Sequence, residues 1–337
     1  MGLAWAAGRA RPLRPDTPLP VPPPLPPGRV VTVPGRAELF VRDLPGPRAP
    51  PSPPILLLHA FMYPSDVTWF GCYAPLGGVG RVLATDFRGH GRGPRPATPF
   101  RLVDVADDVA ALIRTLETGP VIAVGYSLGG AIAQLLWRRH PDVVAGLVLC
   151  ATSASFSTRA QDRWIWRAMG VLQLGLRVLP RPWWEQGVAL QAAGRLPRIF
   201  TRMIHPETPQ ELLELLPWLF GEVDRGSAED IAEAGRELGR YDARDWLHAV
   251  DVPTAVLITA RDRLVPPAGQ HDLADRIPGA SKLVLDADHD GVVAAAEDFV
   301  PLLVEAVRAV AAAASDTRAG GSDTRAGEGT VGRVRPA

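Results

Sequence analysis

The sequence is short of net charge, cysteine and lysine. Its 36 basic and 36 acidic side chains cancel, so no excess of positive charge indicates a nucleic-acid partner. Nearly all of the positive charge is arginine, and Lys282 is the single lysine, which we interpret as a compositional bias rather than a functional signal. Cys72 and Cys150 are the two cysteines, and they lack the spacing of a metal site. We expect both to be free thiols, as in a reducing compartment.

The chain also lacks a long apolar run. No stretch reaches the roughly 18 residues needed to cross a bilayer, so no membrane span is expected. The first ten residues carry a short apolar patch at 3–7 but not the basic segment that opens a secretory signal. These features predict a cytoplasmic protein.

Strand-like and helix-like segments alternate over most of the chain. The apolar runs at 55–58, 121–124 and 146–149 are typical of buried strands, and amphipathic helical segments separate them. Strands that are apolar along their whole length indicate a parallel sheet covered by helices on both faces. A hairpin is expected at 30–33 and 38–42. The predicted fold class is therefore α/β, with a mostly parallel central sheet.

The alternation is interrupted once and fades at both ends. Residues 154–247 contain no buried strand, several amphipathic helical runs and many tryptophans, which predicts a helical cap. The cap would interrupt a catalytic domain formed by residues 29–153 and 248–312. Residues 1–28 form a tail rich in proline and arginine. Residues 313–337 repeat the sequence Ser-Asp-Thr-Arg-Ala-Gly, and we expect this low-complexity segment to be disordered.

The most informative segment is Gly-Tyr-Ser-Leu-Gly at residues 125–129. It follows the apolar run 121–124 and precedes a helical pattern, which is the context that a nucleophile elbow requires. The turn is so sharp that Gly125 and Gly129 must be nearly free of side chain. Ser127 would then project from the top of the sheet as a nucleophile, close to the N-terminus of the following helix.

A serine needs a base and an orienting acid to become a nucleophile at neutral pH. His289 follows the predicted strand 282–285, and Asp262 follows the predicted strand 254–258. Because active sites of parallel sheets form beyond the carboxyl ends of the strands, we predict that these two residues are the base and the acid. Two alternatives remain open here: an ion pair of Asp262 with a neighbouring arginine, and one of the aspartates that flank His289 as the acid.

Acyl transfer also requires two N–H groups that stabilise an oxyanion. Leu128, directly after the nucleophile, should provide one. Phe61, in the loop after the strand 55–58, should provide the other, with Met62 as the alternative. His59 ends the same strand, and we interpret it as structural rather than as a base.

Together these residues resemble the α/β-hydrolase superfamily, in particular its serine-nucleophile members with a helical cap, which include esterases and lipases. The matching features span about residues 30–311. They include the strand end at His59, the turn Asp-Phe-Arg-Gly-His-Gly at 86–91, the elbow, and the chain order Ser127, Asp262, His289. The family role of the 86–91 turn implies that His90 is structural. One departure is Ala60, which stands where the family usually has glycine.

The resemblance implies cleavage of a carboxylic ester through an acyl-enzyme, with no metal and no organic cofactor. A serine at the elbow argues against epoxide hydrolases and haloalkane dehalogenases, which need a carboxylate there. Alternatives on the same fold are an acyltransferase or perhydrolase-like enzyme, a carbon–carbon bond hydrolase, an aminopeptidase and a catalytically silent binding protein. The sequence leaves the oligomeric state open.

The predicted cap bears on the substrate and on membrane contact. Its segment 164–184 combines apolar residues and tryptophans with interspersed arginines. We expect its apolar face to pack on the catalytic domain and to favour a small-molecule ester substrate that is apolar or lipid-like. A lid that meets lipid at the membrane surface is the alternative.

Overall fold

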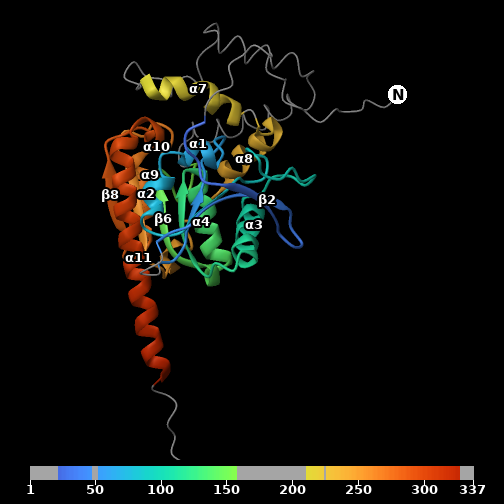
Figure 1. Ribbon diagram of the computed structural model, residues 1–337. Coiled ribbons are helices and arrows are strands. Elements are labelled where there is room, and N and C mark those ends of the chain that lie inside the picture. The colour runs from blue at the N-terminus through green and yellow to red at the C-terminus, as the bar shows by residue number, and fades with distance from the viewer. Residues whose placement is uncertain (1–21, 48–51, 158–209, 224, 327–337) are drawn as a thin grey trace, which may run out of the picture.

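The strands in the described part of the computed structural model belong to one sheet. The structure describes residues 22–47, 52–157, 210–223 and 225–326. In these residues, eight strands lie in the order β1-β2-β4-β3-β5-β6-β7-β8 (Figure 1). Their bounds are β1 Gly28–Thr32, β2 Glu38–Leu44, β3 Ile55–Leu58, β4 Val82–Thr85, β5 Val121–Tyr126, β6 Val144–Cys150, β7 Thr254–Thr259 and β8 Ser281–Leu285.

The pairing of the strands confirms the predicted mostly parallel sheet. The expected hairpin is present, since β1 and β2 pair antiparallel and β2 pairs antiparallel with β4. All other neighbours are parallel. Because β5 lies inside the sheet between β3 and β6, its carboxyl end is surrounded by the loops that follow other strands.

Helices cover both faces of the sheet (Figure 1). The α-helices are α1 Ser65–Trp69, α2 Tyr73–Gly77, α3 Leu102–Thr115, α4 Leu128–Arg139, α7 Gln210–Val223, α8 Ala228–Arg240, α9 Pro267–Arg276, α10 Gly291–Ala294 and α11 Ala296–Ala326, among the described residues. Leu56 and Leu58 of β3 belong to a core with α3 and α4. Ile55 and Leu57 belong to a second core with α2 and α11. Since successive residues of a strand point to opposite faces, this explains why β3 is apolar throughout.

The predicted cap leaves the sheet after β6 and returns before β7. A β-bridge joins Ser155 to Asp242, so the insertion starts and ends at one place. Its described part contains α7 and α8, which lie at the same end of the molecule as α1 and α10 (Figure 1). The tryptophan-rich segment 164–184 lies outside the described residues. The prediction of lipid contact depends on this segment and therefore stays a prediction.

The structure describes a short part of each predicted tail. Leu25 packs against the core and the Pro26 carbonyl accepts a hydrogen bond from Arg42 (2.7 Å), so the end of the segment 1–28 lies against the body. At the other end, α11 continues to Ala326, into the segment 313–337 for which disorder is expected. The alanine run at 311–314 favours a helix where α11 enters this segment.

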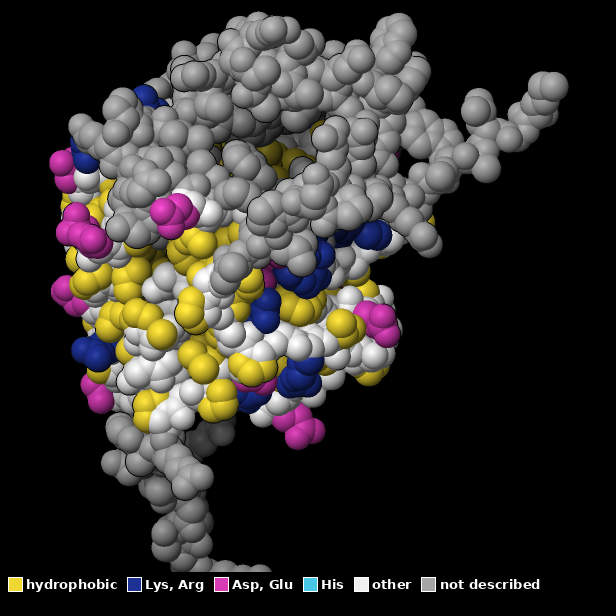
Figure 2. Space-filling view, turned by 45° about the horizontal axis from the view of Figure 1, so that its top comes forward, with side chains coloured by type: hydrophobic (Ala, Val, Ile, Leu, Met, Phe, Trp, Pro, Cys, Tyr) yellow, Lys and Arg dark blue, Asp and Glu magenta, His cyan; other side chains and the backbone are white. Residues whose placement is uncertain are grey.

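The surface of the described residues mixes charge of both signs with apolar side chains (Figure 2). No helix in the described ranges combines the length and the apolar composition of a membrane span. Cys72 and Cys150 are buried free thiols, as expected. Burial raises the pKa of the Cys72 thiol to about 12.

Candidate active site

The elbow has the geometry that its sequence predicts. Ser127 connects β5 to α4 with φ of 52°, a left-handed conformation that strains any residue other than glycine. A Cβ at Gly129 would lie 2.0 Å from the Leu58 carbonyl oxygen, and a Cβ at Gly125 would lie 2.3 Å from the Gly129 oxygen. Both glycines are therefore required by the close approach of β5, α4 and β3.

The imidazole of His289 lies between the side chains of Ser127 and Asp262, within hydrogen-bonding distance of each. The Nε2 atom of His289 is 3.0 Å from Ser127 Oγ, and Nδ1 is 2.8 Å from Asp262 Oδ2. Since a carboxylate can only accept, the Nδ1 atom carries the proton and Nε2 accepts from the serine hydroxyl. The Asp262 side chain is fully buried, whereas the His289 ring keeps 18% of its surface exposed.

The Asp262 carboxylate is held by four further donors. Its Oδ1 accepts from the backbone N–H groups of Leu264 (2.9 Å) and Val265 (2.7 Å). Its Oδ2 accepts from Thr259 Oγ1 (2.8 Å) and Gln270 Nε2 (3.0 Å). A buried carboxylate with this many donors is fixed in orientation.

Gln270 is the site residue that the sequence analysis missed. It lies on α9, is fully buried, and its Oε1 accepts from the Thr259 backbone N–H (3.0 Å). The amide therefore connects the end of β7 to Asp262. No motif marks it, and its spacing of eight residues after the acid is the only signal that the sequence offers.

The two arginines that neighbour Asp262 bind other carboxylates. Arg261 pairs with Asp286 (2.9 Å), and Arg263 donates to Asp288 (2.6 Å). Neither aspartate is bound to the imidazole. Asp288 instead accepts from the backbone N–H of His289 (2.8 Å).

The two predicted oxyanion donors follow neighbouring strands. Leu58 of β3 is paired with Gly125 of β5, and Phe61 and Leu128 each come three residues later. Both loops therefore leave the sheet at the same edge, beside Ser127. Leu128 is the first residue of α4, so its N–H has no partner within the helix. Met62, the alternative donor, has a φ of 70°.

His59 and His90 are buried and bind backbone groups. The Nδ1 atom of His59 donates to the Ala60 carbonyl (2.8 Å), and its Nε2 accepts from the Phe87 N–H (2.9 Å). The Nδ1 atom of His90 contacts the Arg88 carbonyl (3.0 Å). Burial lowers the pKa of His59 to about 4; burial and the neighbouring His59 lower the pKa of His90 to about 3. These contacts agree with structural roles for both residues.

The loop that contains His90 also binds the cap. Arg92 donates to the buried Asp66 (3.1 Å), which also binds Arg42, and to Glu222 of α7 (2.8 Å). The Ser227 N–H, just before α8, donates to the Gly89 carbonyl (2.8 Å). The loop that contains His90 and the described part of the predicted cap are thus joined by an ion pair and a backbone hydrogen bond.

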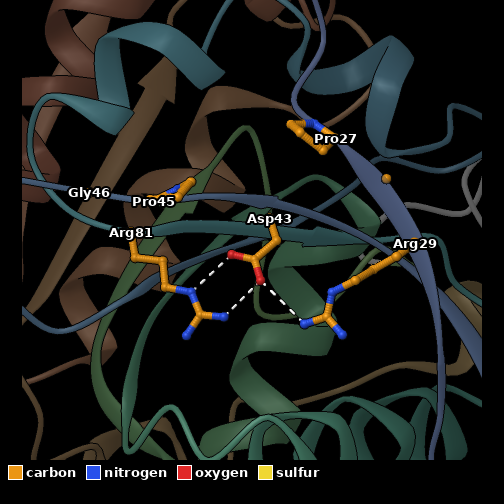
Figure 3. Close-up of a pocket in the computed structure, with 7 residues that line it drawn as sticks. Pro27, Arg29, Asp43, Pro45, Gly46 and Arg81 are labelled. Carbon is orange, nitrogen blue, oxygen red and sulfur yellow. Dashed lines mark hydrogen bonds and ion pairs between the residues drawn. The ribbon is translucent and has the colours of Figure 1, made fainter.

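A pocket of about 460 Å³ lies at the other end of the sheet from Ser127 (Figure 3). Asp43 lies between Arg29 and Arg81, and both arginines bind its carboxylate (3.3 and 2.7 Å). Arg81 immediately precedes β4, so the pocket borders the amino end of that strand, away from Ser127. Within the described ranges, no group of three His, Cys, Asp or Glu side chains is arranged to hold a metal ion.

Comparison with known proteins identifies the family of the fold. The model of the α/β hydrolase fold family matches residues 53–294. The chain belongs to the α/β hydrolase fold family. The match includes the elbow, the acid loop and His289, whereas the first strand pair and α11 lie outside it.

Curated relatives of this α/β hydrolase include enzymes named for ester substrates. A pimeloyl-[acyl-carrier protein] methyl ester esterase of Neisseria meningitidis is 31% identical over 241 residues, which cover 68% of this chain and 84% of the relative. The 3-oxoadipate enol-lactonase 2 of Acinetobacter baylyi is 27% identical and is matched over 62% of this chain and 71% of its own length.

A solved structure supports the fold. An esterase from Exiguobacterium antarcticum superposes with a TM-score of 0.68 at 20% identity, covering 83% of this chain and 99% of the esterase. At this identity the likeness establishes the architecture and leaves the chemistry to the side chains of the site.

Proposed function

We propose that this α/β hydrolase cleaves carboxylic esters through an acyl-enzyme formed on Ser127. The observation that carries the proposal is the hydrogen-bonded chain from Ser127 Oγ through His289 to Asp262. A nucleophile bound to a base that is itself oriented by an acid is the arrangement that acyl transfer requires. The names of the curated relatives, a methyl ester esterase and an enol-lactonase, favour esters over other acyl compounds.

In the first half of the reaction, Ser127 Oγ attacks the ester carbonyl and its proton passes to Nε2 of His289. The backbone N–H groups of Leu128 and Phe61 stabilise the oxyanion of the tetrahedral intermediate. Asp262 stabilises the imidazolium and keeps the ring in position. The C–O bond to the alcohol then breaks, and the alcohol leaves with the proton from Nε2.

In the second half, water takes the place of the alcohol. His289 accepts a proton from the water as it attacks the acyl carbon, a second tetrahedral intermediate forms, and the bond to Ser127 breaks. The proton returns to Ser127 and the carboxylic acid is released. The chain's own side chains and N–H groups supply every proton transfer and every charge contact in this scheme.

We further propose an apolar ester as the substrate and the cytoplasm as the location. The proposal of an apolar substrate rests on the composition of the segment 164–184. The proposal of a reducing compartment rests on the two buried free thiols. Contact of the cap with a membrane surface stays a prediction that depends on the same segment.

The test is hydrolysis of p-nitrophenyl esters from short to long acyl chains, by the wild-type enzyme and by Ser127→Ala. We expect the wild type to hydrolyse at least part of the series and Ser127→Ala to lose about 10⁴-fold or more in kcat. The matched control is Ser153→Ala, which removes another buried serine hydroxyl, one that donates to the Ser155 carbonyl (3.0 Å). Equal activity of wild type and Ser127→Ala would contradict the proposal.

A further inference from the structure

Tyr126, the residue before the nucleophile, contacts the backbone of His289. It is the last residue of β5, and its side chain is 1% exposed. Its hydroxyl donates a hydrogen bond to the backbone carbonyl of His289 (2.7 Å). The two residues are 163 positions apart in the sequence, so the bond joins the central strand directly to the loop that carries the histidine.

The ring of Tyr126 is fixed by three aromatic neighbours. Its centroid lies 6.1 Å from that of Trp69 on α1, 5.7 Å from that of Phe299 on α11 and 5.9 Å from that of the His289 imidazole. All three contacts are edge-to-face, the geometry that aromatic pairs prefer. A ring enclosed in this way holds its hydroxyl at one point, because a rotation would displace a helix or the histidine.

Two consecutive residues therefore contact both ends of the same histidine. Ser127 meets the ring at Nε2, and Tyr126 meets the main chain at the carbonyl oxygen. The remaining bond of the His289 main chain is local, because its N–H donates to the adjacent Asp288. The hydrogen bond from Tyr126 thus holds the backbone of His289 in position relative to β5, the strand that leads into the nucleophile.

We propose that Tyr126 is a positioning residue that sets the distance between His289 Nε2 and Ser127 Oγ through its hydrogen bond to the His289 carbonyl. The inference rests on the proposed function, since it assigns Tyr126 a role in the same reaction. Tyr126 acts through His289 and has no contact with substrate in this proposal. A displacement of about 1 Å in a reacting pair can lower a rate about 100-fold, which makes such a bond consequential.

The test compares Tyr126→Phe with Tyr241→Phe. Tyr241 is a matched control, because it is also buried and its hydroxyl donates to a core side chain, Gln134 (3.1 Å), away from His289. Each variant removes one buried hydroxyl and keeps the ring, so both should lose a similar amount of thermal stability. We expect kcat for the ester to fall about 10- to 100-fold in Tyr126→Phe alone, with KM changed less than about twofold.

Two readouts separate positioning from a general loss of stability. The rate of the acylation burst should fall with kcat in Tyr126→Phe and stay near the wild-type rate in Tyr241→Phe. Equal kcat values in the two variants, measured well below their melting temperatures, would overturn the proposal. If wild type and Ser127→Ala hydrolyse the ester equally, the proposed function fails instead, so the two failures are distinguishable.

Discussion

The histidine bound to the nucleophile, His289, differs from the buried histidines His59 and His90 in what its ring contacts. The ring of His289 lies between a hydroxyl and a carboxylate and is partly exposed. The rings of His59 and His90 are fully buried and bind backbone carbonyls through Nδ1. The comparison teaches that a proton-transfer role depends on the acceptor behind the ring and on exposure of the ring, since a hydrogen bond at Nδ1 is common to all three.

The acceptor matters because it decides whether the charged ring is stabilised. A carboxylate stabilises an imidazolium, whereas a neutral carbonyl in a dry environment does so only weakly. This is why burial outweighs the backbone contacts of His59 and His90 and lowers the pKa of each. Both rings are neutral at pH 7 and can serve only as fixed hydrogen-bonding groups.

The largest effect is expected when a substitution of His289 is compared with a substitution of one of the buried histidines. His289→Ala should lower kcat for the ester on the order of 10⁴- to 10⁶-fold, because it removes the base. His90→Gln should instead retain most of kcat and lower the melting temperature. Steady-state kinetics and thermal unfolding of both variants check the comparison. A His90→Gln enzyme that is folded but inactive would break it.

The second effect comes from making the acceptor of His289 neutral. Asp262→Asn places an amide where the carboxylate lies, so the environment of His289 becomes similar to that of His59. We expect kcat to fall about 10³- to 10⁴-fold with KM little changed, because the imidazolium loses its charge partner and its tautomer is no longer fixed. The measurement is kcat and KM for the same ester. Near-normal kcat would show that the carboxylate is not what distinguishes His289.

The third effect is on the free energy of unfolding and concerns only the two buried histidines, His59 and His90. The pKa of each ring is lowered on folding, so below pH 6.5 the unfolded chain binds protons that the folded protein does not. Stability is therefore complete above about pH 6.5 and falls as the pH drops towards 4 for His59 and towards 3 for His90. Each histidine should remove about 2 kcal/mol from the free energy of unfolding between pH 7 and pH 5.

Urea unfolding at pH 7 and pH 5 tests this third prediction. The double variant His59→Gln, His90→Gln lacks both titrating rings, so its loss of stability between the two pH values should be smaller than that of the wild type by about 4 kcal/mol. An equal loss in both proteins would mean that the two rings are protonated in the folded state at pH 5.

The smallest effect is expected from the surface near His289. Arg263→Gln removes the partner of Asp288, whose carboxylate accepts from the His289 N–H. The unbalanced charge should favour the protonated imidazole and move the acidic limb of the kcat/KM profile to higher pH by less than about one unit, because the pair is exposed and screened. The shift should disappear at high salt. A shift that persists in 1 M salt would point to a cause other than charge.

Much of this arrangement could be predicted from the sequence because it depends on local rules. The apolar strands, the glycines of the elbow and the chain order of Ser127, Asp262 and His289 are readable from short segments. The predictions that they form one sheet and one hydrogen-bonded chain agree with the structure. The family match over residues 53–294 confirms the fold class.

What the sequence could not provide is contact between distant side chains. Gln270 and Tyr126 look like ordinary core residues until α9 and the His289 loop are placed beside them. The pairing of Arg263 with Asp288 rather than Asp262 depends on how two loops face each other. The expectation of disorder at 313–337 rests on low complexity, and α11 continues to Ala326 within that segment.

The bond between Arg92 and Glu222 has a consequence for recombination among relatives. Caps are attractive units to exchange between hydrolases, and the bridge between Ser155 and Asp242 marks a natural crossover point. Arg92, however, is shared between Asp66 below and Glu222 above. A transplanted cap that brings no carboxylate to this position would leave a guanidinium half satisfied at the joint. A functional chimera must therefore inherit the 88–95 loop together with its cap, as one exchangeable block.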